Sequence, residues 1–319
     1  MEVEALRCVS SEGSEGCERA SLCQRLRYSL HFFREPADGG RVSPRMNLRA
    51  SRLAFLALAL ASSVAPRVAA SDETDLRKAD NGLSLDLGAT YLDYTETAGG
   101  TTLDTEKGWL PTATLAFNLL AYPWAPIPNL YFHIDVTGST GSTNYNGALC
   151  DQFGDCTPYQ STTNDTIIAT AARLGRAFSL NRNVMLTPYA EIGYRYWSRD
   201  LTGIGGYGED YYNWEGMGGL LLQYSPAERW VVSLSGGAGS TFGASMQTQG
   251  ETFTLGNELI WRTEAKLGYR ITDRIELTAT GGYQSFGFGA SATDANGYYE
   301  PDSTTHETRL LLGASYHFF

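Results

Sequence analysis

Residues 184–197, VMLTPYAEIGYRYW, decide the fold because two different faces alternate along them. One face carries Val184, Leu186, Pro188, Ala190, Ile192, Tyr194 and Tyr196. The other carries Met185, Thr187, Tyr189, Glu191, Gly193, Arg195 and Trp197. A period of two residues is typical of a β-strand, whose successive side chains point to opposite sides. The stretch therefore predicts a strand with an apolar side and a side that mixes charges with bulky rings.

The same alternation recurs along the chain, in segments as long as the roughly 9–11 residues that a tilted transmembrane strand needs. The segments are 82–94, 109–119, 129–138, 165–177, 184–197, 212–224, 230–242, 257–269, 275–286 and 306–318. In 129–138, Leu130, Phe132, Ile134 and Val136 alternate with Tyr131, His133 and Asp135. In 257–269, Leu259, Trp261, Ala265, Leu267 and Tyr269 lie opposite Arg262, Glu264 and Lys266. An apolar face opposite a charged one predicts a barrel with lipid outside and a polar lumen, although a soluble sandwich also alternates.

The connections separate these two architectures. Long ones, 95–108, 139–164, 198–211, 243–256 and 287–305, alternate with the short ones 120–128, 178–183, 225–229 and 270–274. Long external loops and short periplasmic turns are typical of transmembrane barrels, whereas a sandwich has no reason to sort its loops in this way. The sequence therefore predicts an all-β fold, a single closed antiparallel transmembrane β-barrel of ten strands, with eight or twelve strands as the alternatives.

Aromatic residues concentrate at the ends of the predicted strands. The outer ends carry Tyr91, Trp109, Tyr194, Tyr196, Tyr212, Trp214, Trp261 and Tyr283, and the periplasmic ends carry Phe117, Tyr224, Trp230, Tyr269, Tyr316 and Phe318. Two aromatic girdles around an apolar band about 25 Å tall are typical of outer-membrane barrels.

The C-terminal residues carry a resemblance to a known class. Apolar positions alternate up to a final aromatic in GASYHFF, residues 313–319, which resembles the last strand of bacterial outer-membrane β-barrel proteins. In strand number and size the chain resembles the omptin-like ten-stranded barrels, and it is also similar to the small barrels related to outer-membrane protein A and the opacity proteins. The resemblance implies a location in the outer membrane of a Gram-negative bacterium. It also implies contact with outer-membrane lipid and lipopolysaccharide, and insertion by the barrel-assembly machinery through the C-terminal strand.

The first 70 residues read differently from the rest. Positive Arg49 and Arg52 precede an apolar stretch of twelve residues, 53–64, and the small residues 68–70 follow. This order predicts a secretory signal peptide, residues 46–70, cleaved after Ala70. Residues 1–45 are then interpreted as a mis-annotated or disordered N-terminal extension, and 71–319 as the outer-membrane barrel domain.

The net charge limits the classes of partner, and the cysteines predict a covalent link. The leader holds 10 of the 24 basic and 7 of the 35 acidic residues, so residues 71–319 keep 14 basic and 28 acidic ones and a net charge of −14. Such a surface disfavours binding to nucleic acid, whose phosphates require Lys and Arg.

Cys150 and Cys156 are the two cysteines of residues 71–319 and predict one local disulfide in an oxidising periplasm. A disulfide that closes so short a loop contributes about 2–2.5 kcal/mol in the chain-entropy model.

Candidate catalytic residues are few. Omptin proteases carry an acidic pair on one outer loop and a His–Asp pair on another. Segment 243–256 contains no His or Asp, so the expected second pair is missing there. His133 and Asp135 form a His-x-Asp pair near the outer end of 129–138, directed inward. His306 beside Glu307, with Ser303 nearby, would be the set for a lipid-modifying hydrolase. The sequence assigns no catalytic, cofactor-binding or metal residue, and the non-enzymatic interpretation is favoured.

The inward-facing charges predict a lumen charge network. Its members are Asp86, Asp135, Arg173, Glu191, Arg195, Glu215, Arg262, Glu264, Lys266, Glu276, Glu307 and Arg309. Charges in a narrow barrel must be paired or solvated, so they either fill the lumen as ion pairs or line a small pore. The favoured function is a non-enzymatic outer-membrane barrel whose surface loops contact the envelope, an external ligand or a host surface. The alternatives are a small porin-like channel for polar solutes and an omptin-like protease or lipid-modifying hydrolase.

Overall fold

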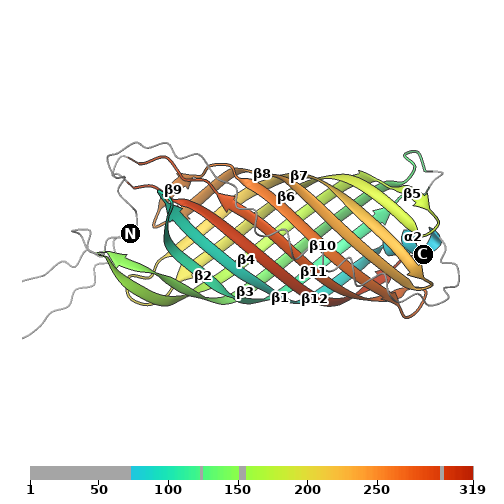
Figure 1. Cartoon of the computed structure of the whole chain (residues 1–319), viewed down its shortest axis with the longest axis horizontal. Helices are drawn as coiled ribbons and strands as arrows, with labels where there is room; N and C mark the ends of the chain where they lie inside the picture. The colour runs from blue at the N-terminus through green and yellow to red at the C-terminus, as the bar shows by residue number, and fades with distance from the viewer. Residues whose placement is uncertain (1–72, 123–124, 151–155, 295–297, 319) are drawn as a thin grey trace, which may run out of the picture.

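A computed structural model describes residues 73–122, 125–150, 156–294 and 298–318. The predicted N-terminal extension and signal peptide lie outside these residues and stay predictions. The elements, labelled as in Figure 1, are α2 Glu73–Ala79, β1 Gly82–Ala98, β2 Thr101–Leu120, β3 Leu130–Cys150, β4 Cys156–Arg176, β5 Phe178–Asn181, β6 Val184–Leu201, β7 Gly208–Ala227, β8 Trp230–Thr248, β9 Glu251–Thr254, β10 Leu259–Arg270, β11 Ile275–Phe288 and β12 Asp302–His317.

Ten long strands close on themselves. They pair in the order β10-β11-β12-β1-β2-β3-β4-β6-β7-β8, and β8 pairs with β10 to complete the ring. Every pairing is antiparallel, and the four-residue β5 and β9 extend the edges of β6 and β8. Figure 1 shows the strands crossing the long axis at a steep tilt. The prediction of a closed antiparallel barrel of ten strands is confirmed.

The alternation of the sequence becomes inside and outside. In β6, each residue from Met185 to Trp197 at an odd position is buried in the lumen, and its even-numbered neighbours face outward. The barrel exterior carries a band of exposed apolar side chains, which we call the lipid belt. It includes Leu85, Leu87, Leu115, Ile134, Val136, Ile168, Leu174, Ile192, Leu220, Leu277, Leu310 and Leu312, with exposed fractions between 42% and 70%. An apolar surface of this extent is suited to a bilayer and not to water.

Aromatic rings border the lipid belt at both levels. On the outer side, rings on neighbouring strands contact one another in pairs, as for Tyr194 and Trp214, which are tilted by 59° with centroids 5.0 Å apart. On the periplasmic side, Trp230 and Tyr269 lie 4.6 Å apart and Phe117 contacts Phe318 at 5.8 Å. These are the two girdles that the sequence predicts.

Four of the five predicted long loops are wrong in length, whereas most of 287–305 lies between β11 and β12 as predicted. Segment 95–108 is continuous strand apart from the turn at Gly99 and Gly100, whose φ angles of 57° and 82° suit a tight hairpin. β3 and β4 run on to Cys150 and Cys156, and most of 198–211 and 243–256 is also strand. Sequence reasoning ended each strand where its apolar face ended. That point marks the edge of the membrane, whereas the backbone ladder continues beyond it through Thr, Ser, Tyr and Asn residues.

The short α2 lies at the same end of the barrel as the C-terminus (Figure 1). Its seven residues lead directly into β1. Among the described residues, no helix is long and apolar enough to cross a membrane.

A charge placed at the middle of the lipid belt should destabilise the barrel. Leu87 lies midway along β1 between Leu83, opposite Phe117, and Tyr91, opposite Trp109. We expect Leu87→Arg to lower the free energy of unfolding in lipid vesicles by about 2–4 kcal/mol, the range for a cation at the bilayer midplane. Thr95→Arg, on the same face but beyond the outer girdle, is the control and should cost under about 1 kcal/mol. Urea unfolding followed by tryptophan fluorescence measures both, and equal losses would show that the belt is misplaced.

Candidate functional site

The lumen is the candidate site, and an apolar layer closes its periplasmic end. This periplasmic layer consists of Leu76, Leu120, Tyr131, Ala177, Met185, Tyr189, Leu221 and Val231. Leu76 comes from α2 and is completely buried among the inward side chains of the strands. The helix therefore sits in the periplasmic mouth as a plug.

Polar contacts hold the plug in place. Asp75 of α2 pairs with Arg270 at 2.5 Å, and Arg77 donates to the Asn129 side chain at 2.9 Å. Directly after the helix, Asp80 accepts a hydrogen bond of 2.8 Å from Gln223. Burial raises the pKa of Asp80 to about 7, although this hydrogen bond works in the opposite direction.

A chain of alternating charges crosses the middle of the lumen. We call it the ion-pair chain, and in order it contains Arg173, Glu191, Arg262, Glu215, Arg195 and Glu307. Successive members are joined by N–O distances of 2.6, 3.1, 2.8, 3.1 and 2.8 Å. The residues come from β4, β6, β7, β10 and β12, and Arg195 and Glu307 are 112 positions apart in sequence. Because each charge has an opposite neighbour, the chain offsets much of the cost of burying these groups.

The remaining members of the predicted lumen charge network lie near this chain. Asp86 accepts a hydrogen bond from Thr278, and His317 approaches Glu276 at 3.5 Å. Arg309 lies 3.7 Å from Glu307. Glu264 and Lys266 face the lumen without any ion pair to the described residues within 4 Å.

A second cluster, which sequence reasoning missed, lies farther out. Arg199 pairs with Glu106 and Glu209 at 2.7 Å each and with Glu96 at 3.4 Å, and its guanidinium lies 4.2 Å from the centre of the Tyr94 ring. These residues fall in stretches that had been interpreted as loops. Alternating burial does resume at 103–106 and continues through 197–201 and 208–211, on either side of the turns, and it is the signal that would have placed Glu106, Arg199 and Glu209 inside the barrel.

This outer cluster is rich in acid. Glu300, in the connection before β12, accepts a hydrogen bond of 2.6 Å from Tyr211. Burial, together with the nearby Glu209 and Glu96, raises the pKa of Glu300 well above its ordinary value. The environment therefore favours its protonated form.

Aromatic and aliphatic side chains pack around the outer cluster. This outer layer consists of Leu92, Tyr94, Leu110, Ile167, Trp197, Tyr211, Met217, Ala244, Met246, Phe253, Leu255, Ile260, Phe286 and Phe288. Trp197 meets the edge of Tyr94 with centroids 5.3 Å apart, and Tyr211 stacks on Phe288 at 5.0 Å. The outer end of the lumen is thus filled by rings and one buried guanidinium.

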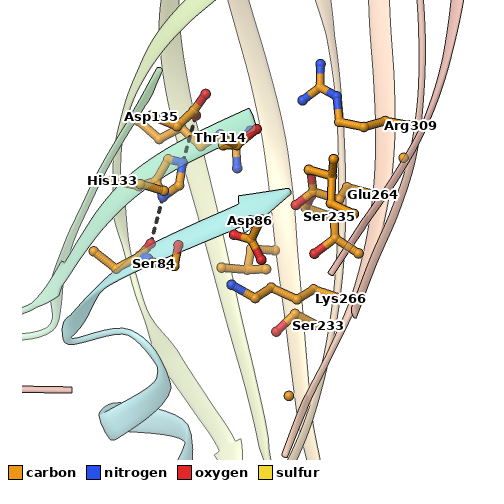
Figure 2. A pocket seen from close by; sticks show the side chains of 18 of the residues that line it. Ser84, Asp86, Thr114, His133, Asp135, Ser233, Ser235, Glu264, Lys266 and Arg309 are labelled. Carbon is orange, nitrogen blue, oxygen red and sulfur yellow. Dashed lines mark hydrogen bonds and ion pairs between the residues drawn. The ribbon is translucent and has the colours of Figure 1, made fainter. Parts of the chain in front are cut away.

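The structure brings His133 and Asp135 together, with Nε2 and Oδ2 2.8 Å apart. The other ring nitrogen lies 2.7 Å from the Asn118 side-chain oxygen, so both nitrogens are engaged (Figure 2). Their expected position near the outer end of the strand is wrong. β3 starts at Leu130 on the periplasmic side, which puts the pair in the periplasmic half of the lumen, far from the outer surface.

The set proposed for a lipid-modifying hydrolase does not assemble. His306 points outward, where its Nδ1 lies 3.0 Å from the Tyr283 hydroxyl. Glu307 points into the lumen and is held by Arg195, and Ser303 is also buried there. Adjacent residues of a strand face opposite sides, so His306 and Glu307 cannot act on one substrate.

Two further predictions concern metals and cysteines. Within the described parts of the chain, no group of three or more His, Cys, Asp and Glu residues is arranged to hold a metal ion. The strand register places Cys150 opposite Cys156 at the end of the β3–β4 hairpin. Their backbone positions are those of direct cross-strand neighbours, and the disulfide itself stays a prediction.

Comparison with known proteins places this geometry in a fold class. No protein-family model matches the chain, and no curated protein matches its sequence. The outer membrane protease OmpT from Escherichia coli is similar in structure, with a TM-score of 0.52 and 12% sequence identity over 75% of this chain and 97% of that chain. The protein has the fold of a bacterial outer-membrane β-barrel. With its lipid belt, it is a protein of the outer membrane of a Gram-negative bacterium.

Two other barrels are similar more loosely. The translocator domain of the autotransporter NalP from Neisseria meningitidis gives a TM-score of 0.36 at 13% identity, covering 74% of this chain and 88% of that chain. Neisserial surface protein A gives 0.30 at 13% identity, covering 74% and 97%. Similarity to OmpT at 12% identity shows the shared fold and not a shared activity.

Breaking the ion-pair chain at Arg195 should be costly. Arg195 is 2% exposed and bridges Glu215 and Glu307, so Arg195→Met leaves Glu307 without its close cation and Glu215 with Arg262 alone. We expect the free energy of unfolding to fall by about 3–5 kcal/mol. The matched control is Lys107→Met, which removes an exposed cation 3.0 Å from Asp93 and should cost about 1 kcal/mol or less. Equal losses in urea titrations would mean that the ion-pair chain is solvated and contributes little.

Proposed function

We propose that the protein is a non-enzymatic, non-conducting outer-membrane barrel whose outer strand extensions contact partners outside the membrane. The observation that carries the proposal is the obstruction of the lumen at both ends. The periplasmic layer with α2 closes one end, and the outer layer with Arg199 closes the other. A porin-like channel needs a continuous polar path between these ends, so the obstruction argues against that alternative.

The separation of the candidate catalytic residues supports the non-enzymatic part of the proposal. His133 and Asp135 are paired with each other and with Asn118 below the outer layer, away from any external substrate. His306 faces the outer side of the barrel, and its Nδ1 lies 3.0 Å from the Tyr283 hydroxyl rather than from the proposed nucleophile Ser303. Neither arrangement provides an activated nucleophile or an activated water at the outer surface.

The outer extensions provide the contact surface. β3 and β4 are 21 residues long and form the hairpin that projects farthest from the barrel in Figure 1. Their outer parts carry Ser, Thr, Asn and Tyr side chains such as Ser142 and Asn164, which hydrogen-bond across the hairpin at 2.8 Å. Polar side chains on a firmly paired backbone can contact a partner at a small cost in conformational entropy.

The net charge of the outer end of the barrel indicates what kind of partner could bind there. The outer connections expose Asp200, Glu251, Glu258 and Asp302, while the described basic residues there are Lys107, paired with Asp93, and the buried Arg199. Lipopolysaccharide phosphates would approach such a rim only through bridging cations. We therefore favour an external partner that presents positive charge.

The wild-type barrel should not conduct in planar bilayers. We expect no discrete current steps, because neither apolar layer leaves a hydrated path. A variant that lacks residues 73–79 and carries Tyr94→Ala, Trp197→Ala and Phe288→Ala removes material from both layers and should show steps, which controls for insertion. Discrete steps from the wild type would overturn the non-conducting part of the proposal and restore the porin-like alternative.

Partner contact is tested with charged beads. The barrel in nanodiscs should bind poly-lysine beads and not dextran-sulfate beads, and the binding should weaken as salt rises. Asp200→Asn with Glu251→Gln and Glu258→Gln should weaken it about tenfold. Neutralising acids at the periplasmic end, Glu228→Gln with Asp273→Asn, is the matched control and should change little. Equal effects of the two sets would show that the attraction reflects net charge and not the outer rim.

A further inference from the structure

Between the two layers the lumen contains a cavity of about 130 Å³, which we call the chamber. Figure 2 shows it from close by, with His133 and Asp135 on one side and Glu264, Ser235, Ser233 and Lys266 on the other. A closed apolar cavity of about 150 Å³ is large enough to hold benzene, so the chamber has room for a small organic molecule or several waters.

The chamber exists because inward positions on one wall are small. Ser233 and Ser235 of β8, Gly268 of β10 and Gly282 of β11 face it, whereas the opposite wall carries Arg173 and His133. At Gly282 an added Cβ would meet no atom closer than 3.7 Å. The space beside Gly282 is therefore open, and neither backbone nor side chain requires a glycine there.

Two opposite charges flank this open position. The strand register places Glu264 of β10 and Arg309 of β12 directly on either side of Gly282. Their backbones are thus separated by two strand spacings, roughly 10 Å. A small molecule that lies over Gly282 can reach both side chains.

Of these two charges, Glu264 is unpaired among the described residues and Arg309 is paired only loosely. Glu264 has no hydrogen bond or ion pair with the described residues, and it is only half-buried because it faces the chamber. Arg309 approaches Oε2 of Glu307 at 3.7 Å, a loose ion pair compared with the 2.8 Å between Oε1 of the same carboxylate and Arg195. The Arg309 Nε is buried without a hydrogen-bond partner, and so are the Gln284 Nε2 and the Ser84 hydroxyl, which also line the chamber. In the ion-pair chain beside them every charged group has an opposite charge within 3.1 Å, although the Arg262 Nε there also lacks a hydrogen-bond partner.

We propose that the chamber is a binding site for a small zwitterion of the size of a simple α-amino acid, with its ammonium group on Glu264 and its carboxylate on Arg309. A zwitterion supplies a partner for both charges without adding net charge to a confined space. A simple anion would pair with Arg309 alone and a simple amine with Glu264 alone, so one of the two charges would gain no partner. The Gln284 amide and the Ser84 hydroxyl provide further hydrogen bonds.

The route into the chamber runs from the periplasm. Ala79 and Asp80, at the end of the plug, line the chamber, whereas the outer layer and Arg199 separate it from the outside. Loading therefore requires α2 to move or the barrel to fold around the ligand. This site is independent of the outer rim and of the absence of conductance, so it goes beyond the proposed surface function.

The test uses the full mature barrel refolded in detergent in the presence of radiolabelled L-alanine, propionate or ethylamine, so that the plug does not prevent loading. After gel filtration, we expect L-alanine to be retained at about one molecule per barrel, and propionate and ethylamine to be lost. Glu264→Gln and Arg309→Gln should each weaken the retention of L-alanine about tenfold or more.

A matched pair of variants locates the bound molecule. Gly282→Leu fills the chamber and should abolish retention, while Gly281→Leu faces the lipid and should leave it unchanged. The shift in gel mobility on boiling shows for each variant whether the barrel has folded. Absence of L-alanine from the wild type, equal retention of the three probes, or retention that survives Gly282→Leu in a folded barrel would each overturn the proposal. None of these outcomes bears on conductance or on bead binding, so failure here is distinguishable from failure of the proposed function.

Discussion

The structure depends on one constraint, which is that no backbone N–H or C=O can remain unpaired in lipid. Closure of β8 on β10, from Trp230 opposite Tyr269 to Ser240 opposite Leu259, removes the last open edge. Once the ring is closed, the strand alternation fixes which side chains lie inside, because every second residue enters a narrow lumen. The lumen contents are therefore a consequence of closure, and they must be compatible with one another across strands that are distant in sequence.

The lumen meets this requirement in different ways at different depths. In the middle of the lumen, each charge of the ion-pair chain is paired with the next one. The Arg195 guanidinium also lies 4.1 Å from the centre of the Phe286 ring. At the ends, rings and aliphatic side chains fill the lumen, and at the outer end they surround Arg199 and its paired carboxylates. Such a lumen resists opening, since moving one charge leaves its neighbours unpaired in a region of low dielectric. The stability of the barrel and the proposed absence of conductance would thus have the same physical origin.

The sequence predicted what depends on local pattern. The alternation in 184–197 correctly assigned both faces of β6, and the aromatic residues correctly marked the two membrane levels. It did not predict the outer ends of the strands, because polarity on both faces looks like a loop when pairing is unknown. The pairing of Arg195 with Glu307 follows from the register of strands that are not adjacent, so no local pattern contains it. Arg199 was missed for both reasons.

The effect of a small residue in the barrel depends on whether it faces the lipid or the lumen. Gly281 and Gly282 are neighbours in β11, yet the first faces lipid, where a missing side chain costs little, and the second leaves open space inside. A barrel under selection only for stability would fill that space, because unfilled volume forgoes packing contacts. Instead, Glu264 and Arg309 stand beside it with unused bonding capacity. Open space beside an unpaired Glu264 and an Arg309 with one loose ion pair is more readily explained by a ligand than by packing.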